Sequence, residues 1–362
     1  MKIFYDHQVF SWQKAGGVSR YFIELMSHLP EDMEYMLPPM LSENVYLESL
    51  GPGMPPVKSW SFANYRVRKK LYEAVNQLRS SAIISRGGFD VLHPTYYSTY
   101  FLRRRKAPFV ITVHDFIHEK YPQYFTDTAK VVREKKEAVT HADRIIAISE
   151  HTKSDLVDIY GIPASRVDVI YHGASSLSPV QEPVPDAGDR FILFVGDRTK
   201  YKNFLNLAEA FMTLSKVDPQ LRLVCAGQPF SPAEMKHFAS LGIADKVMAR
   251  FVTDGQLAWL YGNTACFVFP SAYEGFGLPI LEAWSAGAPV ALSRASCFPE
   301  IAGDAAAWFE PDDPSTMVTA ISDVIYSGDT RSRLQQLASK RLKMFDWGKT
   351  AALTADIYRS LA

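Results

Sequence analysis

Short apolar segments alternate with longer segments of helical period along most of the 362-residue chain. This alternation is typical of parallel sheets that helices cover on both faces. In the first half we expect helices at 18–29 and 131–140, and strands at 3–5, 91–93, 109–114, 144–149 and 167–171. In the second half we expect strands at 191–195, 221–226, 247–251, 266–269, 289–292 and 306–309. The pattern predicts an α/β protein with two Rossmann-like halves.

The pattern breaks once, at 175–189, where three prolines and few large apolar residues disfavour a helix or strand. We expect domains at 1–174 and 190–343, with 175–189 as the linker. The tail, 344–362, places Trp347, Ile357 and Tyr358 at helical spacing. We therefore expect a packed C-terminal helix, with the N-terminal domain as its candidate partner.

Composition narrows the functional class. The hydrophobic share of 47%, the charged share of 22% and the formal net charge of zero are ordinary for a globular protein and do not indicate a nucleic-acid partner. Cys225, Cys266 and Cys297 lack CxxC spacing, so we interpret them as reduced core thiols of a cytoplasmic protein. Asp6 and His7 precede any signal-peptide apolar region, and we expect neither export nor a membrane span.

The most informative segment is 270–289, PSAYEGFGLPILEAWSAGAP, which follows an expected strand. Gly275 and Gly277 let the backbone approach a ligand closely, and Pro279 suits the first turn of a helix. That helix would offer its N–H groups to a phosphate. Glu274 and Glu282 can accept hydrogen bonds from sugar hydroxyls. Alternatively, Glu282 only interacts with the helix dipole and Glu274 is a solvated loop charge.

The Glu274-GFGLPIL-Glu282 segment resembles the signature of the retaining GT-B glycosyltransferases of family four, the group-one enzymes. The resemblance implies two Rossmann-like domains with parallel sheets that face each other across a cleft, an acceptor-side N-terminal domain and a C-terminal domain that binds the nucleotide sugar. It also implies that Glu274 binds hydroxyls of the transferred sugar as a catalytic residue, and that Glu282 binds the ribose. Phe276, Gly277 and Leu278 belong to the same donor loop.

Two further segments carry candidate phosphate ligands. Arg198 and Lys202 follow the first strand of the second half, and a guanidinium fork with an ammonium four positions later can bind a diphosphate together. The alternative is a pair of solvated charges. The family pattern Arg-x-x-x-Lys-Asn matches Arg198, Lys202 and Asn203. Gly16 and Gly17 form a tight turn or an anion-binding loop, and the resemblance places them at the donor diphosphate.

His114 ends the strand expected at 109–114, and ligands of α/β proteins bind at the carboxyl ends of strands. Most histidines at such positions are structural. The resemblance nevertheless implies that His114 lies near the reacting carbon of the sugar, so we name His114 with Glu274 as catalytic. The chain has no Asp-x-Asp, HExxH or CxxC spacing, so we expect neither a metal ion nor another cofactor.

Two basic clusters remain, and both are interleaved with aromatic residues. Such clusters are usually solvated surface. The alternative is peripheral contact with the cytoplasmic membrane face or with a polyprenyl diphosphate. The clusters comprise Arg66, Arg68, Lys69 and Lys70, and Arg103, Arg104, Arg105 and Lys106.

The motifs and the resemblance together thus predict a metal-independent glycosyltransferase that moves a hexose, with retention of configuration implied by the resemblance alone. The opening FYDHQVF and GGVSRYF resemble bacterial mannosyltransferases of surface-polysaccharide or lipopolysaccharide assembly, which makes GDP-mannose the first choice of donor and UDP-sugars the second. The acceptor would be a glycan or a polyprenyl-diphosphate-linked sugar. Alternatives are a nucleotide-sugar epimerase or a pyridoxal-phosphate phosphorylase on the same fold, a dinucleotide oxidoreductase, which the missing GxGxxG disfavours, and a two-lobed sugar-binding protein.

Overall fold

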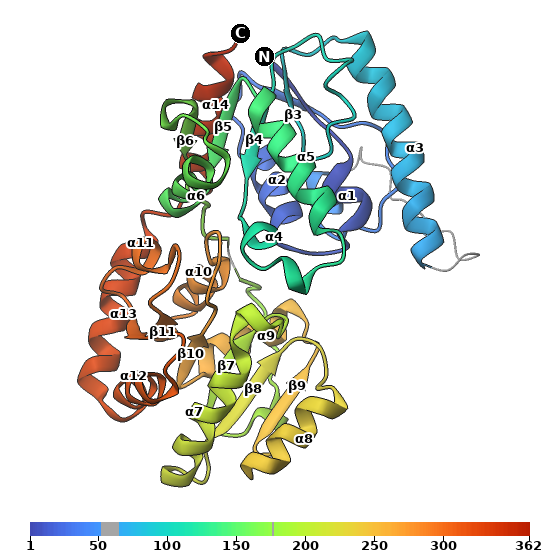
Figure 1. Cartoon of the computed structure of the whole chain (residues 1–362). Helices are drawn as coiled ribbons and strands as arrows, with labels where there is room; N and C mark the ends of the chain where they lie inside the picture. The colour runs from blue at the N-terminus through green and yellow to red at the C-terminus, as the bar shows by residue number, and fades with distance from the viewer. Residues whose placement is uncertain (52–64, 176) are drawn as a thin grey trace. The chain divides into compact units, whose positions relative to one another are not determined.

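The computed structural model describes residues 1–51, 65–175 and 177–362. The chain forms two compact units (Figure 1). Met1–Gly173 and Asp346–Ala362 make the first unit, and Ala174–Phe345 make the second. The chain therefore enters the second unit after Gly173 and returns to the first at Asp346. Each unit is an α/β structure with parallel strands, as the sequence predicts.

The first unit contains two three-stranded parallel sheets. One has the order β2 (Glu34–Met36), β1 (Lys2–Tyr5), β3 (Val91–His93), and the other has the order β4 (Val110–Val113), β5 (Arg144–Ala147), β6 (Val167–Val169). A single parallel bridge between Leu92 and Phe109 links β3 to the segment before β4. β2 was not expected from the sequence, and its residues are exposed or half-buried.

Two helices of the first unit were expected from the sequence, and their bounds differ from the expected ones by one to three residues. The segment expected at 18–29 forms α2 (Gly17–Ser27), and the one expected at 131–140 forms α5 (Thr128–His141). The others are α1 (Gln8–Trp12), α3 (Tyr65–Arg86), α4 (Ile117–Lys120), α6 (Glu150–Tyr160) and α14 (Trp347–Arg359).

The C-terminal helix α14 packs within the first unit (Figure 1). The hydroxyl of Tyr358, near the end of α14, lies 2.9 Å from the hydroxyl of Tyr5 and 2.6 Å from Nδ1 of His93. Tyr358 therefore links α14 to the ends of β1 and β3. Trp347, at the start of α14, is only 4% exposed and lies against Tyr21 of α2. Apolar burial and these hydrogen bonds fix the last helix to the core of this unit.

The second unit has one six-stranded parallel sheet in the order β12-β11-β10-β7-β8-β9. The chain runs from β7 through β8 to β9 on one side, then returns to place β10 on the other side of β7. The boundary between β7 and β10 is therefore the topological switch point of a doubly wound sheet. The strands are β7 (Phe191–Val195), β8 (Arg222–Ala226), β9 (Val247–Arg250), β10 (Cys266–Phe269), β11 (Val290–Ser293) and β12 (Ala307–Phe309).

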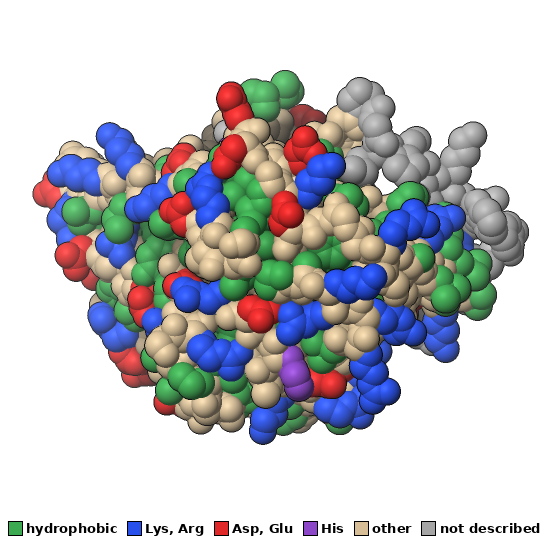
Figure 2. All heavy atoms as spheres, turned by 90° about the horizontal axis from the view of Figure 1, so that it is seen from above, with side chains coloured by type: hydrophobic (Ala, Val, Ile, Leu, Met, Phe, Trp, Pro, Cys, Tyr) green, Lys and Arg blue, Asp and Glu red, His purple; other side chains and the backbone are tan. Residues whose placement is uncertain are grey.

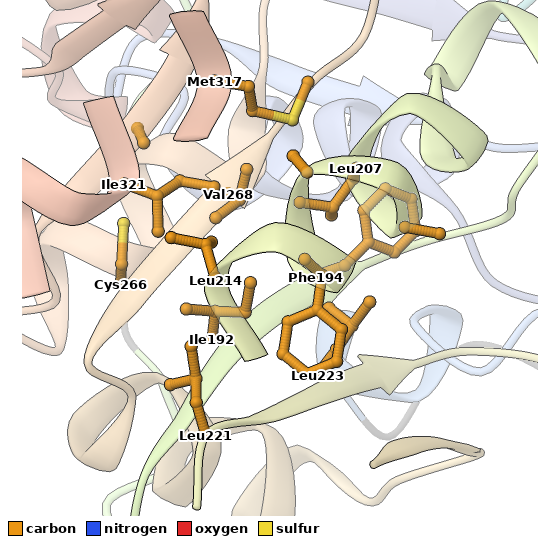
Figure 3. Close-up of a cluster of buried hydrophobic side chains, with 14 of the residues drawn as sticks. Ile192, Phe194, Leu207, Leu214, Leu221, Leu223, Cys266, Val268, Met317 and Ile321 are labelled. Atoms are coloured by element: carbon orange, nitrogen blue, oxygen red, sulfur yellow. The ribbon is translucent and has the colours of Figure 1, made fainter. Parts of the chain in front are cut away.

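Helices cover both faces of a sheet of this kind because its strands are apolar throughout. Side chains at alternating positions of β7, Ile192 and Phe194, lie in one buried cluster with Leu207 and Leu214 of α7 and with Ile321 of α12 (Figure 3). The helices of this unit are α7 (Phe204–Val217), α8 (Pro232–Leu241), α9 (Asp254–Asn263), α10 (Leu278–Ser285), α11 (Phe298–Ala302), α12 (Pro314–Tyr326) and α13 (Gly328–Leu342).

The cysteines are free and buried, as the sequence predicts. Burial raises the pKa of the Cys266 thiol to about 12, so this thiol stays protonated and unreactive at neutral pH. No helix in the described ranges combines the length and apolarity that a membrane crossing requires.

Candidate functional site

The candidate donor site of the second unit lies where β7 and β10 are neighbours. The two strands pair directly, with Cys266 opposite Ile192 and Phe267 opposite Leu193. Their following loops therefore emerge side by side at the carboxyl edge of the sheet, where doubly wound proteins bind ligands. The loop after β7 contains a short 3-10 turn, Lys200–Lys202, and the loop after β10 leads into α10.

An ion pair joins these two loops. Nζ of Lys202 donates to Oε1 of Glu274 over 2.5 Å, and the side chains are only 15% and 13% exposed. The backbone N–H of Ala272 also donates to the carbonyl of Tyr201 over 2.8 Å. The structure thus brings Lys202 and Glu274 together, although the sequence assigned them to different parts of the donor. A cation and a carboxylate in contact here can serve a phosphate and a neighbouring sugar hydroxyl respectively.

The loop that carries Glu274 is held from the next strand. The N–H of Glu274 donates to Oγ of Ser296 over 3.0 Å. Sγ of Cys297 donates to the carbonyls of Glu274 and Phe276, each over 3.3 Å. Sequence reasoning missed Ser296 and Cys297, and the only available signal was their place just after β11, the strand beside β10.

Gly277 ends this loop as the N-cap of α10, with a φ of 98° in the left-handed region that glycine favours. A Cβ at this position would lie 3.0 Å from both Ile280 and Phe298, so these two side chains would have to shift to accept one. Leu278 and Pro279 then begin the helix, as the position of the proline predicts.

Glu282 lies further along α10, where the hydroxyl of Tyr261 donates to its Oε2 over 3.2 Å. Tyr261 comes from α9 and is fully buried. Its hydroxyl therefore orients one carboxylate oxygen, and this contact was not foreseen from the sequence.

Arg198 is not a solvated charge, so that alternative is wrong. Its side chain is 7% exposed, and its Nε donates to Oε1 of Glu234 over 2.6 Å. Its two Nη atoms donate to the carbonyls of Gln228 and Pro229, over 2.8 and 3.0 Å, and its guanidinium lies 4.7 Å from the ring of Phe230. Arg198 and Lys202 thus pair with different carboxylates, and a joint grip on one diphosphate stays a prediction.

His114 follows β4 in the first unit and is buried. Its ring packs edge-on against Tyr21 and stacks on His172, with the ring centres 6.2 Å apart. Among the residues that the structure describes, no hydrogen-bond partner reaches its buried Nε2. Burial lowers the pKa of His114 to about 4, against the opposing effect of Asp115. His114 is therefore a neutral imidazole at physiological pH.

Gly16 and Gly17 open α2, with Gly16 as the N-cap. Oε1 of Gln13 accepts a hydrogen bond from the N–H of Ser19 over 2.8 Å, so a side chain already occupies part of this helix end. Gly17 and Val18 are the first residues of α2, and N–H groups in the first turn of a helix favour the binding of an anion at its amino-terminal end. A Cβ on Gly16 would meet the Gln13 side chain at 2.4 Å.

Comparison with known proteins identifies the family of both halves. Residues 180–341 match the family model "Glycosyl transferases group 1", and residues 15–175 match "Glycosyltransferase Family 4". The D-inositol 3-phosphate glycosyltransferase of Streptosporangium roseum is 30% identical over 318 residues, which cover 78% of this chain and 72% of that protein. The O-antigen chain mannosyltransferase B of Escherichia coli is 27% identical over 284 residues, which cover 74% and 73% of the two chains.

Among solved structures, Anabaena Alr3699/HepE in complex with UDP and glucose has a TM-score of 0.71 at 20% identity, and the match covers all of both chains. That similarity establishes the fold, two Rossmann-like units of the GT-B type. The family matches and the Glu274–Glu282 segment agree with it. The chain belongs to glycosyltransferase family 4, the retaining group 1 glycosyltransferases.

Proposed function

We propose that this enzyme transfers mannose from GDP-mannose to a hydroxyl of a glycan or of a polyprenyl-diphosphate-linked acceptor, with retention, in the synthesis of an O-antigen-type polysaccharide. The E. coli relative is named a mannosyltransferase of the O-antigen chain, which supports the sugar and the pathway. The similar Anabaena structure contains UDP, which keeps UDP-sugars as the alternative donors.

The ion pair between Lys202 and Glu274 is the observation that carries this proposal. The contact between an ammonium and a carboxylate at the switch point of the sheet supports binding of a phosphate by the one and of a sugar hydroxyl by the other. We assign Lys202 to the donor diphosphate and Glu274 to hydroxyls of the transferred sugar. No metal ion is needed in this scheme, because the ammonium and the start of α10 supply the positive charge that the leaving diphosphate requires.

The remaining proposed donor contacts are those that the resemblance to the family implies. Glu282, whose Oε2 accepts a hydrogen bond from Tyr261, would bind the ribose. His114 would act at the reacting carbon as a neutral hydrogen-bonding group. The other proposed donor-binding residues are Gly16, Gly17, Arg198, Phe276, Gly277 and Leu278.

For the chemical step we propose front-face departure, in which the leaving phosphate helps to deprotonate the acceptor hydroxyl. Retaining hydrolases instead use one carboxylate as nucleophile and another as acid. Glu274 is the candidate carboxylate nearest the proposed sugar site, and its Oε1 is bound to Lys202, which favours recognition of hydroxyls over attack on carbon. Detection of a mannosyl adduct on Glu274 by mass spectrometry would contradict this scheme.

We also propose that the enzyme works at the cytoplasmic membrane face. Figure 2 shows Lys and Arg side chains on one face of the molecule, with Asp and Glu side chains among them. Lys70, Arg103, Arg104 and Lys106 are exposed and available to anionic lipid. Arg68 and Arg105 are bound to Glu43 and Asp143, Lys69 lies near the Trp12 ring, and the side chain of Arg66 lies outside the described residues.

The donor is tested by thermal shift with GDP, UDP, ADP and dTDP in EDTA, because a ligand that binds only the folded state raises the melting temperature. We expect GDP alone to stabilise the protein, and Lys202→Met to abolish this shift. The matched control is Lys200→Met, which changes a neighbouring lysine of the same turn. Transfer of radiolabelled mannose from GDP-mannose to a lipid-linked acceptor then completes the test. Stabilisation by UDP alone would replace mannose with a UDP-sugar as the proposed donor.

A further inference from the structure

Lys135 of α5 is a fully buried lysine outside the donor loops. A buried ammonium needs close partners, because removal from water costs several kcal/mol of solvation free energy, on the order of the whole stability margin of a domain. The sequence does not distinguish Lys135 from the other charged residues of the segment 133–137, REKKE, as the one that is buried. Its position in the core therefore points to a specific task.

The partners of Lys135 lie just beyond β4. Nζ donates to the carbonyl of Asp115 over 2.9 Å and to Oε2 of Glu119, also over 2.9 Å. The ammonium lies 5.1 Å from the ring of Tyr97. Glu119 is only 6% exposed, and its other oxygen accepts a hydrogen bond from the hydroxyl of Tyr160. Glu119 thus neutralises Lys135 and is itself held by α6.

These contacts meet at the backbone of His114. The ladder between β4 and β5 ends at Val113, which pairs with Ala147, so the sheet itself does not fix the two residues that follow. The N–H of His114 instead donates to the hydroxyl of Tyr97 over 3.1 Å, and Lys135 binds the carbonyl of the next residue. The backbone is thereby held on both sides of the His114 side chain.

We propose that Lys135, neutralised by Glu119, is a positioning residue that fixes the His114–Asp115 backbone and so sets the His114 ring for sugar transfer. The inference rests on the proposed role of His114 in the transfer reaction. Lys135 acts through the backbone, so its loss should lower kcat and leave the KM for the donor unchanged, because donor binding is assigned mainly to the second unit. A misplacement of about 1 Å can lower a rate about 100-fold.

The test is the double variant Lys135→Met/Glu119→Gln. It removes one charge of each sign, and the uncharged replacement of a buried ion pair often leaves stability unchanged. We expect a melting temperature close to that of the wild type, a donor KM within about twofold and a kcat about 10- to 100-fold lower. The matched control is Arg144→Met/Asp168→Asn, an ion pair of 2.6 Å at the opposite, amino-terminal end of β5.

A second readout does not need catalysis. The ring signals of 13C-labelled His114, assigned by their loss in His114→Gln, should move in the Lys135 double variant and stay in place in the control. If the double variant fails to fold, Tyr160→Phe, which removes only the hydroxyl bound to Glu119, should still move these signals. Unmoved signals together with wild-type kcat would overturn the inference about Lys135.

The outcomes also separate this inference from the proposed function. If His114→Gln loses activity and the double variant does not, His114 keeps its role and Lys135 is structural. If His114→Gln keeps full activity, the catalytic role of His114 is wrong, and the inference about Lys135 falls with it. If GDP-mannose is not the donor, the signals of His114 still report whether Lys135 positions the ring.

Discussion

Replacement of Glu274 by glutamine should separate nucleotide binding from sugar transfer. In the structure Nζ of Lys202 lies 2.5 Å from Oε1 of Glu274, so a donor diphosphate has to compete with this carboxylate for the ammonium. A hydrogen bond between charged groups contributes about 1.5–3 kcal/mol. Glu274→Gln weakens that competing contact, so GDP should bind as tightly as before or up to about tenfold more tightly, a gain of about 1.4 kcal/mol.

Transfer should respond in the opposite direction. The variant loses the carboxylate that we assign to the sugar, and removal of one group that stabilises a transition state costs about 100- to 1,000-fold in kcat. The assays are calorimetric titration with GDP and single-turnover mannosyl transfer. Glu310→Gln is the matched control, because Glu310 also pairs with a cation, Arg294, but over 3.7 Å and with 59% exposure. A GDP affinity that falls tenfold or more, or transfer within threefold of the wild type, would refute the assignment of Lys202 and Glu274.

Three further predictions concern the scaffold. Arg198→Met should lower the free energy of unfolding by about 1.5–3 kcal/mol in a urea titration, because it removes the hydrogen bonds between Arg198 and Glu234 while half-buried Glu234 keeps those from Ser231; an unchanged midpoint would limit Arg198 to ligand binding. Trp347→Ala should cost about 3–5 kcal/mol and lower the calorimetric transition of the first unit alone. Burial lowers the pKa values of His93 and His114 to about 3 and about 4, so the unfolded chain binds more protons below pH 6.5. Stability should therefore fall as pH drops from 6.5 towards 4, as followed by circular dichroism, and His114→Gln should flatten this slope.

The strands could be predicted from the sequence because most are short apolar runs that are buried on both faces. The expected segments 91–93, 191–195 and 266–269 coincide with β3, β7 and β10. Most of the others differ from the expected segments by one or two residues at one or both ends, because the end of a strand depends on its partner. The expected strand 109–114 ends as β4 at Val113, where the pairing with β5 stops. β2 was missed, because its apolar residues Tyr35 and Met36 are only half-buried at the edge of the sheet beside β1, and a short strand of this kind gives a weak signal.

The candidate site was only partly predictable. The motif identified Glu274, and strand order explains its meeting with Lys202, since β7 and β10 are neighbours although the two residues are 72 positions apart. The partner of Arg198 could not be predicted in the same way. Glu234 also belongs to a capping box with Ser231, so its local role already accounts for a glutamate at that position. A second, tertiary role leaves no separate trace in the sequence.

Lys135 shows why buried polar groups are the hardest part of such a site to predict. The charged segment of α5 around Lys135 has the same sequence pattern as an exposed surface helix. Which of its lysines is buried depends on the tertiary structure. The fold makes that choice because the chain beyond β4 leaves the part-buried carbonyl of Asp115 without a strand partner, and Lys135 donates to it. This contact lies at the carboxyl edge of the sheet, where strands end and ligands bind. Buried charges that hold the ends of strands are therefore the residues to examine first when a sequence motif gives the ligand-binding groups but not their support.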